Sequence, residues 1–375
     1  MKKKYIVGIS AVLFIVVTLC VVIFSWHKAF SSESDLNFLA AKIDNTVEYL
    51  KKNLNLEETA GNSNEDWLFI SLCRIGDDSF LEEYTFNLLK YIGNSSSDLS
   101  STELSRIAIS AYVGGIDLKN VSFSDGKSFF EAEAFNDYGS SAKKQGVVAL
   151  SYLLLVQNLY KISFEQDFYS EENLLSEINS YILSDGGFSI TGDVGDVDTT
   201  AIVLLCLSYI ENPIAKKIVN SCILFLEKSY ENNGKYVSFG VESSESVSQV
   251  ALAYISVGNL ENAKDAERTL LRFSLPDGSY SHTIGGESNI LSSVQALNAL
   301  TSIWAEKHGF LPFSPFSADR YDKFNSELSA DLLRISDIII WKSVYYIFLL
   351  ILICEFLIIS VFFFVRRFRS LKSNS

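Results

Sequence analysis

Apolar residues in the middle of the chain recur at helical spacing, and short polar turns rich in Gly, Ser and Asn separate the runs. Six of the predicted helices share a composition rich in Ala, Leu, Ile and Val on most faces, which indicates that they are buried on most faces. They cover Trp67–Cys73, Glu103–Val113, Lys143–Gln157, Thr199–Tyr209, Ser246–Ser256 and Ser292–Trp304. Between them we expect further helices over 32–65, Phe80–Ile92 and Phe129–Phe135. The pattern predicts an all-α fold of about six helical hairpins, with inner and outer helices alternating around a ring.

Three segments repeat one another in the second half of the chain. They read D185GGFSITGDVGDVDTTAIVLLCL, N232NGKYVSFGVESSESVSQVALAYI and P276DGSYSHTIGGESNILSSVQALNAL. Each opens with a Gly-containing polar turn and an aromatic residue (Phe188, Tyr236, Tyr280), and each ends in an Ala- and Leu-rich helix. The aromatics lie 48 and 44 residues apart, a period typical of arrays of helical hairpins. Gln145, Gln249 and Gln295 are predicted to occupy matching places in three of the inner helices.

Long apolar segments occur at both ends of the chain. Tyr5 to Ser25 follows three lysines, and a segment from about Val344 to Val365 precedes several basic residues. Each is long enough to span a bilayer, and the basic flanks predict that both termini are cytoplasmic. The sequence therefore predicts a cell-membrane protein with an N-terminal anchor over 1–28, an extracellular helical domain over 29–305, a stalk over 306–342, a second transmembrane helix over 343–366 and a basic tail over 367–375. Cleavage near Ala29-Phe30-Ser31, as in a secretory signal peptide, stays open.

The charge of the chain limits its partners. The formal net charge is −14, and residues 29–341 hold twice as many acidic as basic residues. Such a surface repels nucleic acid, so no nucleic-acid partner is expected. It is compatible with cationic ligands, metal ions or basic proteins, and also with a role in solubility alone.

The five cysteines give no redox or metal motif. Cys20 and Cys354 fall in the two apolar terminal segments, and Cys206 is predicted to be a small buried residue of an apolar helix. A disulfide between Cys206 and Cys222 is one possibility that the sequence leaves open.

The repeats resemble the α/α toroid of terpenoid cyclases and protein prenyltransferases, known as the prenyltransferase and squalene oxidase repeat. The residues that carry the resemblance are Asp185-Gly186-Gly187-Phe188, Asp196-Val197-Asp198-Thr199-Thr200-Ala201 and the Gly-aromatic turns at Gly234 and Gly278. The resemblance covers roughly residues 36–305. It implies a ring of helical hairpins, but toroids of this kind include enzymes, cobalamin carriers and thioester domains, so it does not define the activity.

Asp198 has two interpretations. Squalene–hopene-type cyclases carry an Asp-x-Asp-Asp-Thr-Ala run whose third residue protonates an alkene or epoxide. By that match Asp198 is the acid and Asp196 its neighbour, but Thr199 replaces the following Asp. The simpler interpretation is that Asp198 caps the helix that begins beside it. Ser246 and Ser292 are taken as its counterparts, and because both are good capping residues we expect a cap.

No cofactor is expected. Protein prenyltransferases bind zinc through Asp, Cys and His, but the turns here lack a suitable Cys, and the chain has three histidines: His27, His282 and His308. The Cys-Gly-Glu-Gln run of complement-like toroids is absent from the sequence. Asp193, Asp196 and Asp198 share one loop and form a weak candidate for calcium, with solvated acids as the alternative.

Glu355 lies near the middle of the second apolar terminal segment. A carboxyl group at such a depth is costly and indicates either contact with a membrane-protein partner or a protonated Glu within an intrachain helix pair.

These observations predict a membrane-anchored, non-catalytic surface protein whose toroid binds an extracellular ligand or protein. The predicted contacts are Phe188, Asp196, Asp198, Tyr236, Tyr280 and His282. One alternative is a terpenoid cyclase-like enzyme that uses Asp198 as general acid. Another is a subunit of a membrane complex coupled through Glu355.

Overall fold

The structure, a computed structural model, describes residues 35–54, 60–132, 135, 142–163 and 170–329. The chain divides into two compact units, Met1–Phe324 and Asn325–Ser375. The described residues of the second unit, 325–329, are helical. The first unit is mostly helical, so the predicted all-α class is confirmed.

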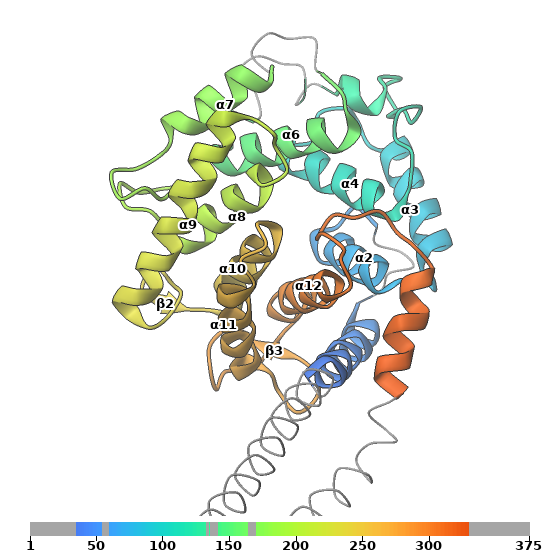
Figure 1. The fold of residues 1–375 in the computed structure, drawn as a ribbon. Helices are drawn as coiled ribbons and strands as arrows, with labels where there is room; N and C mark the ends of the chain where they lie inside the picture. The colour runs from blue at the N-terminus through green and yellow to red at the C-terminus, as the bar shows by residue number, and fades with distance from the viewer. Residues whose placement is uncertain (1–34, 55–59, 133–134, 136–141, 164–169, 330–375) are drawn as a thin grey trace, which may run out of the picture. The chain divides into compact units, whose positions relative to one another are not determined.

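Six helices of the first unit contact one another in a closed circuit. α2 packs on α4, α4 on α6, α6 on α8, α8 on α10, α10 on α12, and α12 packs back on α2 (Figure 1). These are the six helices predicted to be equivalent. Their bounds are α2 Ser63–Ile75, α4 Ser101–Gly114, α6 Val147–Tyr160, α8 Val197–Leu207, α10 Ser244–Ser256 and α12 Ile290–Lys307. Nearly every residue of α8 is buried, as the apolar run Ala201–Leu207 predicts.

The remaining helices lie against this circuit and bury one face each. α3 packs on α2, α9 on α8, and α11 on α10, while α7 contacts both α6 and α9. In α3 the buried residues Tyr84, Leu88 and Ile92 recur every four positions, which is the spacing of one helix face. The bounds are α3 Leu81–Asn94, α7 Glu171–Ser180, α9 Pro213–Asn233 and α11 Leu260–Leu270, with short 3₁₀ turns η1 at Phe129–Glu131 and η3 at Leu271–Phe273.

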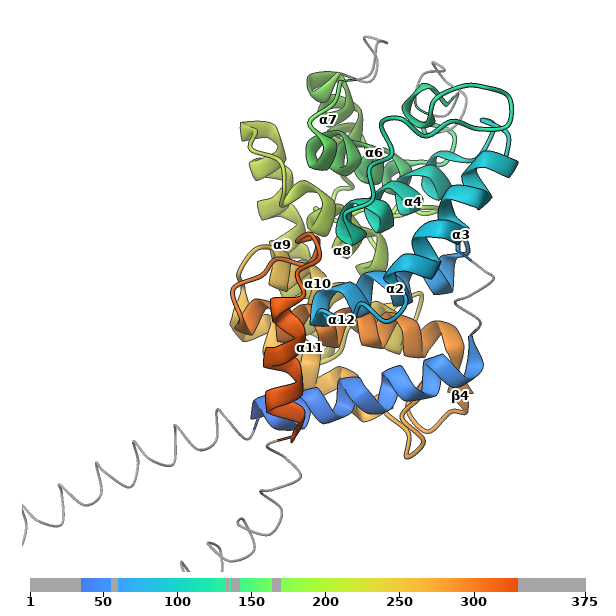
Figure 2. The ribbon, with the colours of Figure 1, turned by 90° about the vertical axis from the view of Figure 1, so that its right-hand side faces the viewer.

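Two further helical segments complete the unit. Residues 35–53 form a helix that reaches the turn after η3, where Lys42 Nζ lies 3.5 Å from Ser274 Oγ (Figure 2). A Cβ at Gly278 would lie 2.4 Å from the carbonyl oxygen of Asn45, so only glycine fits this contact. The chain is helical again from residue 319.

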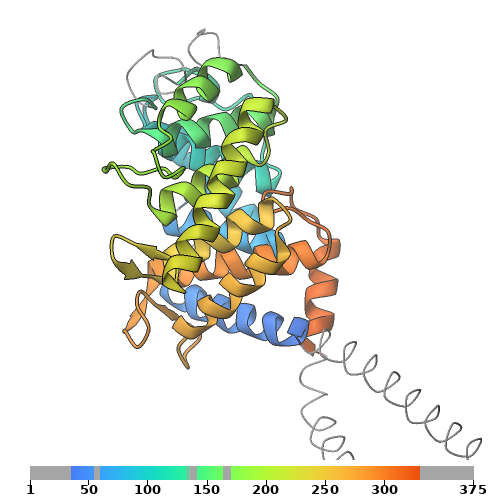
Figure 3. The same cartoon turned by 60° about the vertical axis from the view of Figure 1, so that its left-hand side comes forward.

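Three loops of similar design precede α8, α10 and α12. The second loop contains the ribbon of β1 (Val237–Ser238) and β2 (Val241–Glu242), and the third contains that of β3 (Tyr280–Ser281) and β4 (Ser288–Asn289). In the first loop a single bridge joins Phe188 and Asp196. The three loops follow one another along the same side of the unit (Figure 3).

The residues after α12 pack against the helices over their described part, although 306–342 is predicted to be a stalk. Arg74, at the end of α2, donates from Nε to the carbonyl oxygen of Pro312 over 2.5 Å and from Nη1 to that of Asn298 over 2.8 Å. Phe313 is buried, and the backbone N–H of Phe316 donates to the carbonyl of Val113 over 2.7 Å. The first unit therefore extends to Phe324.

The predicted localisation, a cell-membrane protein with cytoplasmic termini and an extracellular domain, needs correction. Within the described ranges no helix combines the length and apolar character needed to cross a bilayer. The longest described helices, α9 and the helix of residues 35–53, carry Lys, Glu and Asn along their length. The two apolar terminal segments, and Glu355 in the second of them, lie outside the described residues.

Two smaller predictions also need correction. Cys206 is buried as expected, but Cys206 and Cys222 are free thiols, so the possible disulfide between them is not formed. Gln145 does not match Gln249 and Gln295, because it precedes α6 and accepts the backbone N–H of Thr102 over 3.1 Å at the start of α4.

Candidate functional site

The three repeated loops place their aromatic residues in the core. Phe188, Tyr236 and Tyr280 are 0–1% exposed. In the first and third loops the next helix supplies the same support, because Thr200 Oγ1 accepts the backbone N–H of Phe188 and Ser293 Oγ accepts that of Tyr280, each over 2.9 Å. These predicted contact residues are thus packing residues, and their rings are not offered to a ligand from solvent.

The residue before each of α8, α10 and α12 caps the helix. Asp196 Oδ1 accepts the N–H of Thr199 over 2.7 Å, and Ser243 Oγ and Asn289 Oδ1 accept the N–H three residues on, each over 3.1 Å. The prediction that Asp198 is the cap is therefore wrong. α8 begins at Val197, two residues earlier than a cap at Asp198 would require. Ser246 and Ser292 are the third residues of their helices, so their counterpart in α8 is Thr199.

Counted from the caps, Asp198 is the second residue of α8, and its counterparts are Glu245 in α10 and Leu291 in α12. Two neighbouring inner helices thus carry a carboxylate at the same position of the first turn. The backbone N–H groups of this turn favour negative charge. Sequence reasoning missed Glu245, although aligning the helices by their caps would have identified it.

Asp198 is half-buried at the start of α8. Burial raises the pKa of its carboxyl group; hydrogen bonds from Ser246 and Ser238 offset part of that effect, and the nearby Asp196 and Glu245 raise the pKa further. The side-chain oxygen Oδ1 is buried without a hydrogen-bond partner. Ser238 belongs to β1, and its Oγ also lies 3.5 Å from the backbone nitrogen of Asp198, so the second loop lies against the start of α8.

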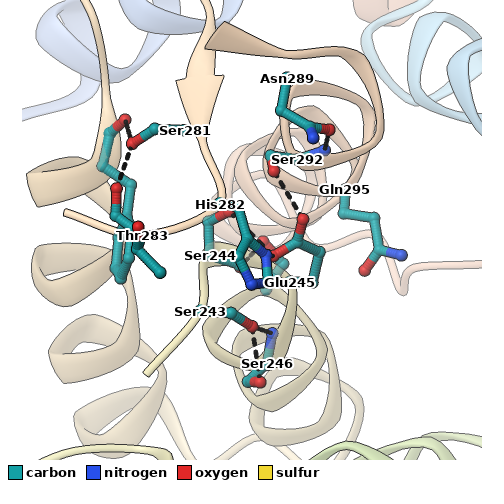
Figure 4. A network of polar contacts seen from close by, with 12 residues as sticks. Ser243, Ser244, Glu245, Ser246, Ser281, His282, Thr283, Asn289, Ser292 and Gln295 are labelled. Atoms are coloured by element: carbon teal, nitrogen blue, oxygen red, sulfur yellow. Dashed lines mark hydrogen bonds and ion pairs between the residues drawn. The ribbon is translucent and has the colours of Figure 1, made fainter. Parts of the chain in front are cut away.

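Glu245 joins three successive elements (Figure 4). Its Oε2 lies 2.9 Å from His282 Nδ1, and its Oε1 accepts a hydrogen bond from Ser292 Oγ over 2.5 Å. The carbonyl of His282 accepts the N–H of Ser244 over 3.0 Å, so the third loop lies against the start of α10 as the second lies against α8. Because a carboxylate only accepts, Nδ1 of His282 carries a proton, and the half-exposed ring leaves Nε2 toward solvent.

One turn further along these helices, Gln249 Nε2 donates to Gln295 Oε1 over 3.0 Å. We name the set Asp198, Ser238, Ser246, Glu245, His282 and Ser292 the carboxylate cluster. It lies at the N-terminal ends of α8, α10 and α12 and brings together two of the predicted contact residues, Asp198 and His282.

The three acids of the first loop do not form a metal site. Asp193 is exposed, and Asp196 uses both carboxylate oxygens for the N–H and hydroxyl groups of Thr199. Across the part of the chain that the structure describes, no three His, Cys, Asp or Glu side chains are placed to hold a metal ion.

Comparison with known proteins adds no assignment: no protein-family model matches the chain, and no curated protein matches its sequence significantly.

Proposed function

We propose that the circuit of six helices is an α/α toroid and that the protein is a non-catalytic binding module. The resemblance of its repeats to the terpenoid cyclase and prenyltransferase toroids supports the ring. The contacts between α12 and α2 also support the ring. Its site is the carboxylate cluster, where the N-terminal ends of three consecutive ring helices meet.

The pair of carboxylates, Asp198 and Glu245, is the observation that carries this proposal. The oxygen atoms of Glu245 are held by His282 and Ser292, which fixes the side chain in one orientation. Asp198 has an oxygen atom without a donor, and burial and neighbouring acids disfavour its charge. A cationic group placed beside both would relieve the repulsion between these neighbouring acids. The ligand is therefore a cation.

Binding of a fluorescein-labelled hexalysine peptide to the full chain tests the proposal by fluorescence anisotropy. Glu245→Gln and Asp198→Asn each remove one charge and nearly preserve shape, so each is expected to raise the Kd about tenfold. Glu211→Gln is the matched control, because Glu211 follows the opposite end of α8 and pairs at the surface with Lys216. Equal losses in all three variants would show attraction to net charge alone and would contradict a localised site.

A second candidate is a terpenoid cyclase-like enzyme with Asp198 as general acid, which the raised pKa of Asp198 favours. Its immediate surroundings are the hydroxyls of Ser238 and Ser246 and the carboxylate of Glu245, and a polar setting of this kind suits cation binding better than alkene protonation. Incubation of the full chain with squalene and with polyprenyl diphosphates tests it. A cyclised product that disappears in Asp198→Asn would replace the binding proposal.

A further inference from the structure

The loops around the carboxylate cluster present apolar side chains to solvent. Phe239 is 74% exposed at the tip of the β1–β2 ribbon, and Val194 is 72% exposed in the loop before α8. Each of the three loops contributes at least one such residue; the set comprises Ile190, Val194, Phe239, Val241 and Ile284. We name these five residues the apolar tips. Exposed apolar side chains gathered at adjacent loops, beside buried polar groups, mark an interaction surface.

The tips gather on one surface because each loop lies against the helix before its own. The second loop contacts the start of α8 through Ser238 and Asp198, and the third contacts the start of α10 through His282 and Glu245. Figure 3 shows the loops in succession along one side of the unit. The carboxylate cluster therefore lies at the base of these loops, with the apolar tips beyond it.

Phe239 occupies a backbone conformation that a phenylalanine rarely adopts. The ribbon joins Ser238 to Val241 through two residues, Phe239 with a φ of +50° and Gly240 with a φ of +84°. Two positive φ values define a type I′ turn, whose first position favours Asn, Asp or Gly. A bulky side chain there costs free energy and gains no burial in return. An exposed aromatic residue held at such a cost indicates a function for its ring.

The charge of the three loops indicates which kind of ligand this surface binds. Lys235 is the one lysine or arginine in the three loops, whose residues 185–196, 234–243 and 276–289 are all described. Besides the buried cap Asp196, the same loops hold five acidic residues: Asp185, Asp193, Glu242, Asp277 and Glu287. Together with Asp198 and Glu245 they form an acidic surface that attracts cations and rejects acidic partners.

We propose that this surface binds a basic peptide segment of a partner protein, one in which apolar residues alternate with lysine or arginine. The cationic side chains reach the carboxylate cluster, and the apolar ones pack on Phe239 and the neighbouring tips. The inference rests on the proposed cation site and extends it, because a small cation would leave the tips uncovered.

The test compares two labelled peptides on the full chain: hexalysine, and a dodecamer of alternating lysine and leucine. Phe239→Asn places in the turn a residue that its backbone prefers. The variant is therefore expected to unfold at the same or a higher temperature, yet to bind the lysine–leucine peptide about tenfold more weakly, with hexalysine binding unchanged. Phe86→Asn is the matched control, because Phe86 is 66% exposed on α3, away from the three loops.

The outcomes separate this inference from the proposed function. Equal affinity for both peptides, together with unchanged binding in Phe239→Asn, would contradict the role of the apolar tips but not the proposed cation site. Failure of both peptides to bind would overturn both. Self-association of the chain that depends on Phe239, seen by sedimentation velocity, would assign the surface to a second copy and overturn the peptide proposal.

Discussion

Asp198 and Glu245 occupy the same position in neighbouring helices, but their surroundings differ. Glu245 is held by His282 and Ser292, whereas Asp198 has a buried carboxylate oxygen without a donor. Because burial raises the pKa of Asp198, its charged form is less favourable in the folded protein than in the unfolded chain. An ionisable group retained at a cost to stability is expected where it serves binding.

The raised pKa of Asp198 predicts a pH dependence. For an acid with a raised folded-state pKa, the native state binds more protons than the unfolded state, so its contribution to stability is complete below the ordinary value of 3.8 and is lost as pH rises above it. Asp198→Asn should therefore become more stable than the wild type as pH increases from about 4 to 8. Thermal unfolding of both proteins across that range checks it. A wild type whose stability increases relative to that of Asp198→Asn as pH rises would contradict the raised pKa of Asp198.

At the scale of elements, the caps and glycines of the repeated loops determine where each inner helix begins. Asp196 accepts two hydrogen bonds from Thr199, and Asp185 accepts the backbone N–H groups of Gly187 and Gly195 over 3.0 and 2.8 Å. These two acids thus shape the loop and the start of α8. They leave Asp198 as the acid of this segment directed to the neighbouring helix.

Loss of the cap should weaken α8. Asp196→Ala removes the acceptor for Thr199 and is expected to lower the free energy of unfolding by about 1 kcal/mol. Chemical denaturation measures the change. Asp193→Ala, which removes an exposed acid of the same loop, is the control and should leave stability unchanged; equal losses in both variants would contradict the role of Asp196 as the cap.

Alanine substitutions at two glycines of the first loop are predicted to differ in their effect on stability. A Cβ at Gly187 would lie 2.6 Å from the ring of Phe225 in α9, whereas at Gly192 the nearest atom is 3.5 Å away. Gly187→Ala should therefore cost about 1–3 kcal/mol of unfolding free energy through overpacking. Gly192→Ala should stay within about 0.5 kcal/mol of the wild type. The same denaturation series distinguishes them, and a neutral Gly187→Ala would show that the loop and α9 are not in close contact.

The sequence was sufficient to predict the inner helices and insufficient to predict the site. An apolar pattern on all faces defines α8, α10 and α12 without knowledge of their neighbours. The cap depends on where the backbone becomes helical. Asp198 directly precedes two threonines, whereas the actual cap, Asp196, is followed by Val197, so the sequence pattern indicated the wrong aspartate. The contact of Glu245 with His282 and Ser292 joins the second repeat to the third, and it forms only when the helices lie side by side.

On the scale of the whole molecule, the closure from α12 to α2 connects residues more than 200 positions apart. Arg74 is fully buried there, and it donates to the carbonyls of Asn298 in α12 and Pro312 beyond it. Phe313 covers the guanidinium group, with 5.8 Å between the guanidinium carbon and the ring centre. The segment after α12 is therefore part of the contact between α2 and α12, which is why the prediction of a stalk does not describe its described residues.

The contact of Arg74 with α12 predicts that substitution of Arg74 lowers the free energy of unfolding more than substitution of a surface arginine does. Arg74→Ala removes the guanidinium group that donates to the Pro312 carbonyl and links α2 to Asn298 in α12, and it should cost roughly 2–4 kcal/mol of unfolding free energy, with faster hydrogen exchange in both α2 and α12. Arg268→Ala, which removes an exposed arginine of α11, is the control. Exchange that increases in α2 alone would indicate that Arg74 does not hold α2 and α12 together.

Photo-crosslinking of the full chain tests the central claim most directly. The probe is the lysine–leucine dodecamer with a diazirine on one leucine, and mass spectrometry locates the crosslinked residues. Crosslinks are expected in the loops before α8, α10 and α12, centred on 238–241, and they should be lost in Glu245→Gln. Crosslinks that fall instead on the outer helices α3, α7 or α11, or that persist unchanged in Glu245→Gln, would contradict it.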